Sequence, residues 1–229
     1  DELVVIHDDT LERTTDAAVR LPDRAPWHVH EATLADIRSL TAGVAPDGTP
    51  QQVPTLAEVI DLVRHHDVGL LIETKTLFTG DRLEAAIGDL VRTYDDADDW
   101  IAGRLMVGSF DWSSLLRARE ALPGVHLALI VGWLAVDERG GITASGPLDD
   151  DITGVGTPLA AVRDRLAAEG VGYLGTMVLG MAGQIANDFS AADVEWFRQG
   201  GVEINFITDD PEVMGTYIDA GVSSILTNH

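Results

Sequence analysis

The stretch Val68-Gly69-Leu70-Leu71-Ile72-Glu73-Thr74-Lys75 is an apolar run of strand length that ends in a carboxylate and an ammonium. Residues two apart in a β-strand point to the same face, so we expect Glu73 and Lys75 to project together from the carboxyl end of this strand. Lys75 is also the only lysine of the chain, which indicates a specific role for its ammonium group. A salt-bridged strand end without a functional role is the alternative that these residues leave open.

Beyond this stretch, strand-like apolar runs alternate with helical patterns. Together with residues 68–73, the predicted strands are residues 105–110, 126–131, 171–177, 203–207 and 223–226. The predicted helices between them are residues 83–94, 112–122, 158–169, 191–199 and 211–220. Strands separated by helices of about ten residues form βαβ units and a parallel sheet. The sequence contains no Gly-x-Gly-x-x-Gly turn, which disfavours a dinucleotide-binding fold. We therefore predict an α/β fold, a (β/α)8 TIM barrel, with its site at the carboxyl ends of the strands.

The part of the chain before residue 68 is predicted to be less regular. Leu3–Ile6 are predicted to form the second arm of a hairpin. Helices are predicted to follow Thr33 and Thr55, and Glu58 completes a capping box with Thr55. Six predicted strands do not close an eight-stranded barrel. We therefore expect residues 1–229 to be a single barrel domain that is N-terminally incomplete, with its first two strands, about 40–50 residues, missing upstream.

The composition excludes several classes of protein. The chain has no cysteine, which excludes disulfides and thiolate metal sites. Its formal net charge of −23 argues against binding to nucleic acids or anionic membranes. The longest apolar stretch, residues 125–136, is too short to span a bilayer. We expect a soluble protein, cytoplasmic or secreted, while its compartment and its oligomeric state stay unknown at this point.

A candidate acid–base group lies at the end of the first predicted strand, where His7 precedes Asp8 and Asp9. Histidine titrates near neutral pH and can act as a general acid or base, although a surface histidine in a turn is the alternative. His7, Glu73 and Lys75 together provide an acid–base group, an oxygen ligand and a cation. This set suits a phosphate ester held on Mg²⁺ or Ca²⁺, but one carboxylate rarely holds such an ion, so partner carboxylates are needed.

Six motifs of the chain resemble, in the same order, those of the glycerophosphodiester phosphodiesterase family. They are residues 1–15 (a DG turn and VVxHDxxLxRTT in the family), 54–59 (PTLxEV), 71–75 (LxIExK), 107–110 (VxSF), 206–214 (WTVNxPExM) and 221–228 (GVDGIITD). In the fifth motif Phe206 stands for Trp and Asp209 for Asn. The resemblance implies a barrel of the PLC-like phosphodiesterase type. It also implies metal-dependent hydrolysis of glycerophosphodiesters, substrates of lipid metabolism, to glycerol 3-phosphate and an alcohol, with one divalent cation, Mg²⁺ or Ca²⁺.

The resemblance also implies roles for single residues. His7 corresponds to one of the family's two catalytic histidines, and Glu73 corresponds to a metal ligand. Lys75 is expected to be a second catalytic residue, which binds the substrate and neutralises charge on its phosphate beside the metal. Phe206 is a candidate wall of the glycerol pocket, with plain barrel core as the alternative. Trp133, just after a predicted strand, is a candidate to line the mouth of the site.

Two motifs of the family are not found in these residues. They are HRG, with the other catalytic histidine and an arginine, and ExD, with two metal ligands. A second hypothesis is a non-catalytic barrel that binds a phosphorylated ligand or partner, and it would be favoured if the upstream sequence had other residues in place of HRG and ExD. A lipid cyclase of the phospholipase D type is disfavoured, because the short interval from His7 to Pro54 leaves no room for a large insertion. We favour the phosphodiesterase, with these motifs upstream, since His7, Glu73 and Lys75 are all kept.

Overall fold

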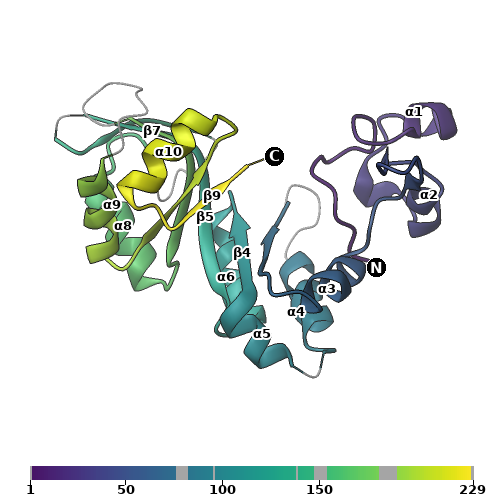
Figure 1. Cartoon of the computed structure of the whole chain (residues 1–229), viewed down its shortest axis with the longest axis horizontal. Coiled ribbons are helices and arrows are strands. Elements are labelled where there is room, and N and C mark those ends of the chain that lie inside the picture. The colour runs from purple at the N-terminus through teal and green to yellow at the C-terminus, as the bar shows by residue number, and fades with distance from the viewer. Residues whose placement is uncertain are drawn as a thin grey trace. The chain divides into compact units, whose positions relative to one another are not determined.

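The computed structural model describes residues 2–75, 82–94, 96–137, 139–146, 154–180 and 190–227. The chain forms two compact units, and many of their elements are labelled in Figure 1. Unit 1 comprises Asp1–Leu70 and Lys75–Asp95, and unit 2 comprises Leu71–Thr74 and Asp96–His229. The expected single barrel domain over residues 1–229 stays a prediction.

Unit 1 packs short elements around a small apolar core. Its helices are α1 (Ala17–Arg20), α2 (Leu34–Arg38), α3 (Leu56–Arg64) and α4 (Leu83–Val91), with 3-10 turns η1 (Pro22–Arg24) and η2 (Val29–Glu31). The short strands β1 (Gly43–Val44) and β2 (Pro50–Gln51) pair antiparallel. One buried cluster comprises Leu11, Ala17, Ile37, Leu40 and Val53, while α3 and α4 bury Leu56, Ile60, Ile87 and Val91. The first cluster lies under the segment that carries His7, because Val4 and Ile6 pack against it.

The predicted helix starts in unit 1 are confirmed. Thr33 and Asp36 form a capping box at the start of α2, and Thr55 and Glu58 form one at the start of α3. In each box the threonine accepts a backbone N–H while the carboxylate accepts the N–H of the cap residue. A hydrogen bond from Arg38, at the end of α2, holds the pKa of Glu58 below its usual value. The two helices are therefore joined by an ion pair at their ends.

The first segment differs from the prediction. Leu3–Ile6 do not form a strand within residues 2–75, and Val4 makes only an isolated antiparallel bridge to Thr55. The N–H of Val5 donates to the carbonyl of Pro54 at 2.9 Å, and the N–H of Leu56 donates to that of Leu3 at 2.8 Å. The segment therefore pairs with the residues that lead into α3, where the helix start limits the pairing to a single bridge.

Unit 2 contains the predicted alternation of strands and helices. Its strands are β3 (Leu70–Glu73, whose first residue falls in unit 1), β4 (Leu105–Ser109), β5 (His126–Val136), β6 (Ile142–Gly146), β7 (Tyr173–Gly180), β8 (Glu203–Ile207) and β9 (Ser224–Leu226). Its helices are α5 (Ala97–Arg104), α6 (Trp112–Ala121), α8 (Leu159–Ala168), α9 (Ala191–Gln199) and α10 (Pro211–Ala220). The sheet has the order β3-β4-β5-β7-β8-β9, and the described pairings from β4 to β9 along this path are parallel. All six predicted strands are thus confirmed.

One face of this sheet is covered by helices. Side chains on that face alternate with those on the other, and Val107, Leu129, Leu174, Ile204 and Phe206 are each at most 2% exposed. From the helices, the fully buried side chains include Leu115, Leu166, Phe197 and Tyr217. Helices α8 and α9 lie side by side (Figure 1), where the guanidinium of Arg163 lies 4.0 Å from the ring centroid of Trp196. This layered packing is that of βαβ units.

Three elements of unit 2 differ from the prediction. The acidic run at residues 95–99 predicts a solvated turn, but Ala97–Arg104 form α5 with Trp100 and Ile101 buried. The glycine- and aspartate-rich residues 136–154 predict a loop, but β6 returns antiparallel along the second half of β5. β5 itself is longer than predicted and reaches Val136. In each case a helix or strand includes polar or glycine residues at which the sequence pattern predicts a turn or a loop.

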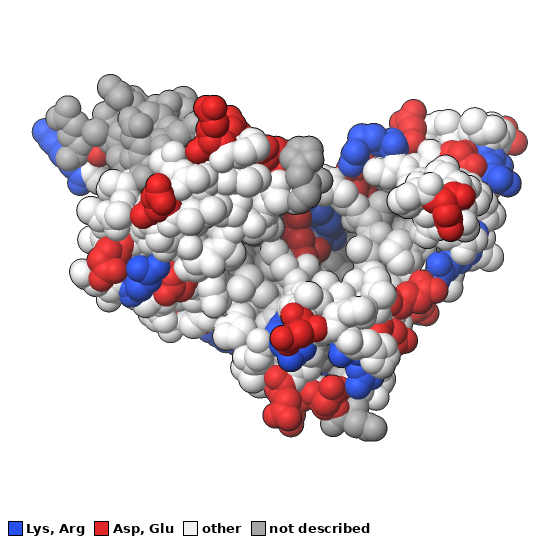
Figure 2. All heavy atoms as spheres, viewed as in Figure 1, with Lys and Arg blue, Asp and Glu red and all other residues white. Residues whose placement is uncertain are grey.

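The surface fits the acidic composition. Figure 2 shows Asp and Glu side chains at separate places over the visible face rather than in one patch. Among the helices of the described residues, none has the length and apolar character needed to cross a membrane.

Candidate functional site

His7 lies on a segment of unit 1 that is fixed on both sides by backbone hydrogen bonds. Before it, Val5 is bonded to Pro54, and after it the carbonyl of Asp9 accepts the N–H of Val29 at 2.9 Å. The N–H of Leu11 donates to the carbonyl of Trp27 at 3.0 Å, and the Leu11 side chain is in the core. A short polar stretch between two such fixed points has a defined path, so the side chains of His7 and Asp8 start from defined positions.

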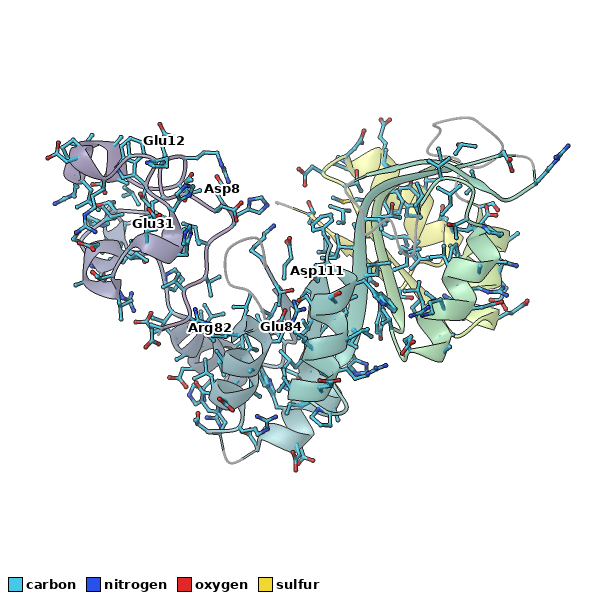
Figure 3. All side chains as sticks on the ribbon, turned by 180° about the vertical axis from the view of Figure 1, so that it is seen from behind. Asp8, Glu12, Glu31, Arg82, Glu84 and Asp111 are labelled. Carbon is cyan, nitrogen blue, oxygen red and sulfur yellow. The ribbon has the colours of Figure 1, made fainter. Side chains whose placement is uncertain are left out.

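Asp8 connects His7 to Arg13. The Nδ1 atom of His7 lies 2.7 Å from Oδ1 of Asp8, and Nη2 of Arg13 donates to the same oxygen at 2.6 Å. Nε of Arg13 donates to Oδ2 at 2.5 Å, so the guanidinium meets the carboxylate with two parallel hydrogen bonds. Figure 3 labels Asp8 on the segment before α1. The hydrogen bonds from Arg13, and then from His7, lower the pKa of Asp8 well below its usual range.

This arrangement assigns the protons of the imidazole. An ionised carboxylate only accepts hydrogen bonds, so Nδ1 of His7 carries the proton that is donated to Asp8. Nε2 is then the atom of the ring that is available to gain or lose a proton toward a ligand. The His7 side chain is 72% exposed, so a ligand can reach this atom from solvent. The geometry is that of a general acid–base group oriented by a carboxylate.

Glu73 ends β3 in unit 2 and is half-buried. The next residue, Thr74, continues the pairing with β4, because its N–H donates to the carbonyl of Gly108 at 2.9 Å. The oxygen of Glu73 therefore stands at the carboxyl end of a sheet strand, as predicted for a site of an α/β barrel. Lys75 follows two residues later, is also half-buried and belongs to unit 1.

The other two candidates lie in unit 2. Phe206 in β8 is 0% exposed, and its ring stacks on that of Tyr217 from α10 with centroids 3.5 Å apart. These are the contacts of a core residue, and its role as a wall of the glycerol pocket stays a prediction. Trp133 lies inside β5, paired with Val178 of β7, rather than after the strand. Its side chain is outside the described part of the chain.

The joint arrangement of the candidates around one ligand stays a prediction. His7 and Lys75 belong to unit 1, whereas Glu73, Trp133 and Phe206 belong to unit 2. The structure adds residues that the sequence did not single out: Arg13 beside Asp8, and Ser114 beside Thr74. Arg13 has a sequence signal, since it is part of the motif at residues 1–15 that also contains His7. Ser114 has none, because it lies forty residues from Thr74.

A divalent cation would need more ligands than these. Within the described residues, no group of three or more His, Asp or Glu side chains is arranged to hold a metal ion. Mg²⁺ and Ca²⁺ take six or more oxygen ligands, several of which are usually carboxylates or waters. Glu73 has the right chemistry for one of them, but the described residues do not complete the set.

Comparison with known proteins agrees with this fold and these motifs. A family model described as the glycerophosphoryl diester phosphodiesterase family matches residues 1–229. Bacillus subtilis YhdW, provisionally named a glycerophosphodiester phosphodiesterase, is 31% identical over 131 residues, which cover 56% of this chain and 48% of YhdW. The chain spans about half the length of the curated relatives it matches.

Solved structures share the fold of this chain. A Silicibacter pomeroyi protein, provisionally named a glycerophosphoryl diester phosphodiesterase, aligns with a TM-score of 0.72 at 23% identity, covering 99% of this chain and 75% of that one. The Oleispira antarctica phosphodiesterase OLEI02445, solved with its product sn-glycerol-3-phosphate, aligns with a TM-score of 0.69 at 19% identity, covering 98% and 74%. These likenesses confirm the predicted α/β barrel class. The chain belongs to the glycerophosphoryl diester phosphodiesterase family.

Proposed function

We propose that the protein hydrolyses glycerophosphodiesters to glycerol 3-phosphate and an alcohol. Membership of the family over residues 1–229 supports the reaction class. The relative from Oleispira antarctica carries sn-glycerol-3-phosphate as its product, which supports the same product here. The observation that carries the proposal is the His7–Asp8–Arg13 arrangement, because it leaves an exposed imidazole with one nitrogen oriented by a carboxylate.

His7 is the proposed acid–base group at the alcohol oxygen. In hydrolysis one P–O ester bond breaks, water supplies a hydroxyl group to phosphorus, and the alcohol oxygen gains a proton. Nε2 of His7 carries that proton while Nδ1 keeps its hydrogen bond to Asp8. Lys75 neutralises negative charge on the phosphate, as the only ammonium side chain of the sequence. Neither role requires that Phe206 or Trp133 contact the substrate.

A divalent cation, Mg²⁺ or Ca²⁺, is part of the proposal for the full-length protein. Glu73 is its proposed ligand, since a carboxylate at the carboxyl end of a strand is a suitable oxygen donor. When bound, such an ion stabilises charge on the phosphate oxygens. The described residues do not complete its ligand set, so no step given above depends on it.

The test is release of glycerol 3-phosphate from glycerophosphocholine by the full-length protein with Mg²⁺, Ca²⁺ or Mn²⁺. We expect release that His7→Ala lowers by a factor of about 10² or more, because a positioned acid–base group contributes that much. We also expect a chelator to abolish it. His65→Ala is the matched control, since His65 is an exposed histidine at the end of α3. No release with any of the three ions would contradict the proposal and leave a non-catalytic barrel that binds phosphorylated ligands.

A further inference from the structure

The residue between Glu73 and Lys75 is held by a buried pair of hydroxyl groups. Oγ1 of Thr74 lies 2.7 Å from Oγ of Ser114 in α6, and the two residues are 4% and 0% exposed. Oγ1 of Thr74 also lies 3.5 Å from the carbonyl oxygen of Gly108, whose closer partner is the N–H of Thr74 itself at 2.9 Å. Thr74 is therefore bonded to β4 through its backbone and to α6 through its side chain.

Ser114 is in turn a fixed point. It lies in the first turn of α6, where the side chain of the cap residue Asp111 accepts the N–H of Ser113 at 2.8 Å. The N–H of Asp111 donates to Oγ of the buried Ser109 at 3.1 Å, which ties the helix start to the end of β4. Figure 3 labels Asp111 at this end of α6. Leu115, the next residue, is 0% exposed under the helix.

Thr74 lies between Glu73 and Lys75 in the chain, so its contacts affect how both of these candidate site residues are held. Along an extended segment successive side chains point to opposite faces, so we expect Glu73 and Lys75 to leave the face opposite to Thr74. When Thr74 is bonded on its own face, the backbone that carries both neighbours has one orientation. Functional groups must be held within about 0.5 Å of their productive positions, and that precision comes from the residues behind them.

We propose that the Thr74–Ser114 hydroxyl pair positions the Glu73–Lys75 motif for function. The pair acts by fixing the carboxyl end of β3 to the start of α6, so Thr74 and Ser114 are positioning residues and not catalytic ones. This inference rests on the proposed function of Glu73 and Lys75, but the structural part of it can be measured without activity.

The first measurement is amide hydrogen exchange in residues 70–75, compared with residues 203–207 of β8 as an internal reference. Thr74→Val keeps the shape of the side chain and removes the hydroxyl, and Ser114→Ala removes its partner. In both variants we expect exchange in residues 70–75 to rise about fivefold more than in β8, because a buried hydrogen bond is lost locally. Thr74→Ser keeps the hydroxyl and should restore slow exchange. Thr176→Val is the matched control, a buried threonine in β7 of the same sheet.

The second measurement is the hydrolysis of glycerophosphocholine by the full-length protein. Thr74→Val and Ser114→Ala should each lower kcat about tenfold with little change in KM, and the double variant should lower it no further. Thr74→Ser and Thr176→Val should stay near the wild type. An equal rise of exchange in residues 70–75 and in β8 would overturn the proposal, and so would an unchanged kcat. If the wild type releases no product, the proposed function fails, while the exchange data still decide whether the pair fixes this strand end.

Discussion

The Nδ1 atom of His7 lies 2.7 Å from Oδ1 of Asp8, its neighbour in the chain. The side chains of two adjacent residues rarely hydrogen-bond to each other, because they leave the backbone in different directions. Here Arg13 holds the Asp8 carboxylate with both Nε and Nη2, so the carboxylate is turned toward the histidine ring. The acid–base group, its orienting carboxylate and the guanidinium therefore form one connected unit within residues 7–13.

Asp8→Asn tests the orienting carboxylate. The amide keeps the shape but removes the charge that fixes the proton on Nδ1, so we expect kcat for glycerophosphocholine to fall at least about tenfold. Asp9→Asn is the control, because it neutralises the next carboxylate. In ¹⁵N spectra, neutral His7 of the wild type should show the Nδ1–H tautomer, and Asp8→Asn should show a mixture. Equal effects of the two substitutions on kcat would contradict a special role for Asp8.

Arg13→Lys tests the bidentate contact between Arg13 and Asp8. A lysine keeps the charge but cannot form two parallel hydrogen bonds, so we expect Asp8 to lose its fixed orientation and kcat to fall by a factor of about 3 to 10. Arg20→Lys changes a similar exposed ion pair, in which Nε of Arg20 lies 2.8 Å from Asp16, and should leave kcat unchanged. If the Arg13→Lys variant hydrolysed glycerophosphocholine at the wild-type rate, the Arg13–Asp8 contact would be a surface ion pair without a role in catalysis.

The pH dependence of Asp8 follows from its lowered pKa. Because the folded pKa lies below the usual 3.8, the folded state binds fewer protons, and the contact is complete above that value. It is lost only as the pH falls below 3.8 toward the lowered value. We therefore expect the Asp8 carboxyl carbon, followed by NMR, to titrate with a midpoint below 3.8. In the Arg13→Lys variant the midpoint should rise, and a wild-type midpoint above 3.8 would contradict the geometry.

Phe206 allows its two interpretations to be separated. If Phe206 is a core residue stacked on Tyr217, the Phe206→Ala substitution should lower the free energy of unfolding of the protein by about 3–5 kcal/mol. Phe206→Leu should cost less, with KM for glycerophosphocholine unchanged. Chemical denaturation measures the first effect and steady-state kinetics the second. A raised KM in a fully stable Phe206→Leu variant would instead support a pocket wall.

The fold was predictable where local signals agree with the tertiary structure. The capping residues Thr33, Thr55 and Ser190 mark helix starts that the structure contains. The six strands β3, β4, β5, β7, β8 and β9 were visible as apolar runs because one face of the sheet is covered by helices. α5 was missed because its two buried residues, Trp100 and Ile101, are adjacent and give no helical periodicity.

The site was predictable only in part. The Glu73 strand end and the His7 turn are encoded by short contiguous motifs, and the structure places Glu73 at the end of β3. Contacts between distant residues carry no such local signal, and Thr74–Ser114 is one of them. Phe206 was assigned by its match to a motif, which does not say which face of β8 it occupies. Its partner Tyr217 on α10 decides that question.

The return of β6 along β5 has a consequence for which strand edges another chain could pair with. β7 occupies one edge of β5, while β4 pairs with residues 126–129 on the other edge and β6 continues that edge from residue 133. Unpaired edges are templates on which other chains add strands and aggregate. β4 and β6 together pair with residues 126–129 and 133–136 along this edge, so most of the longest strand of the sheet is shielded from association with a neighbouring molecule.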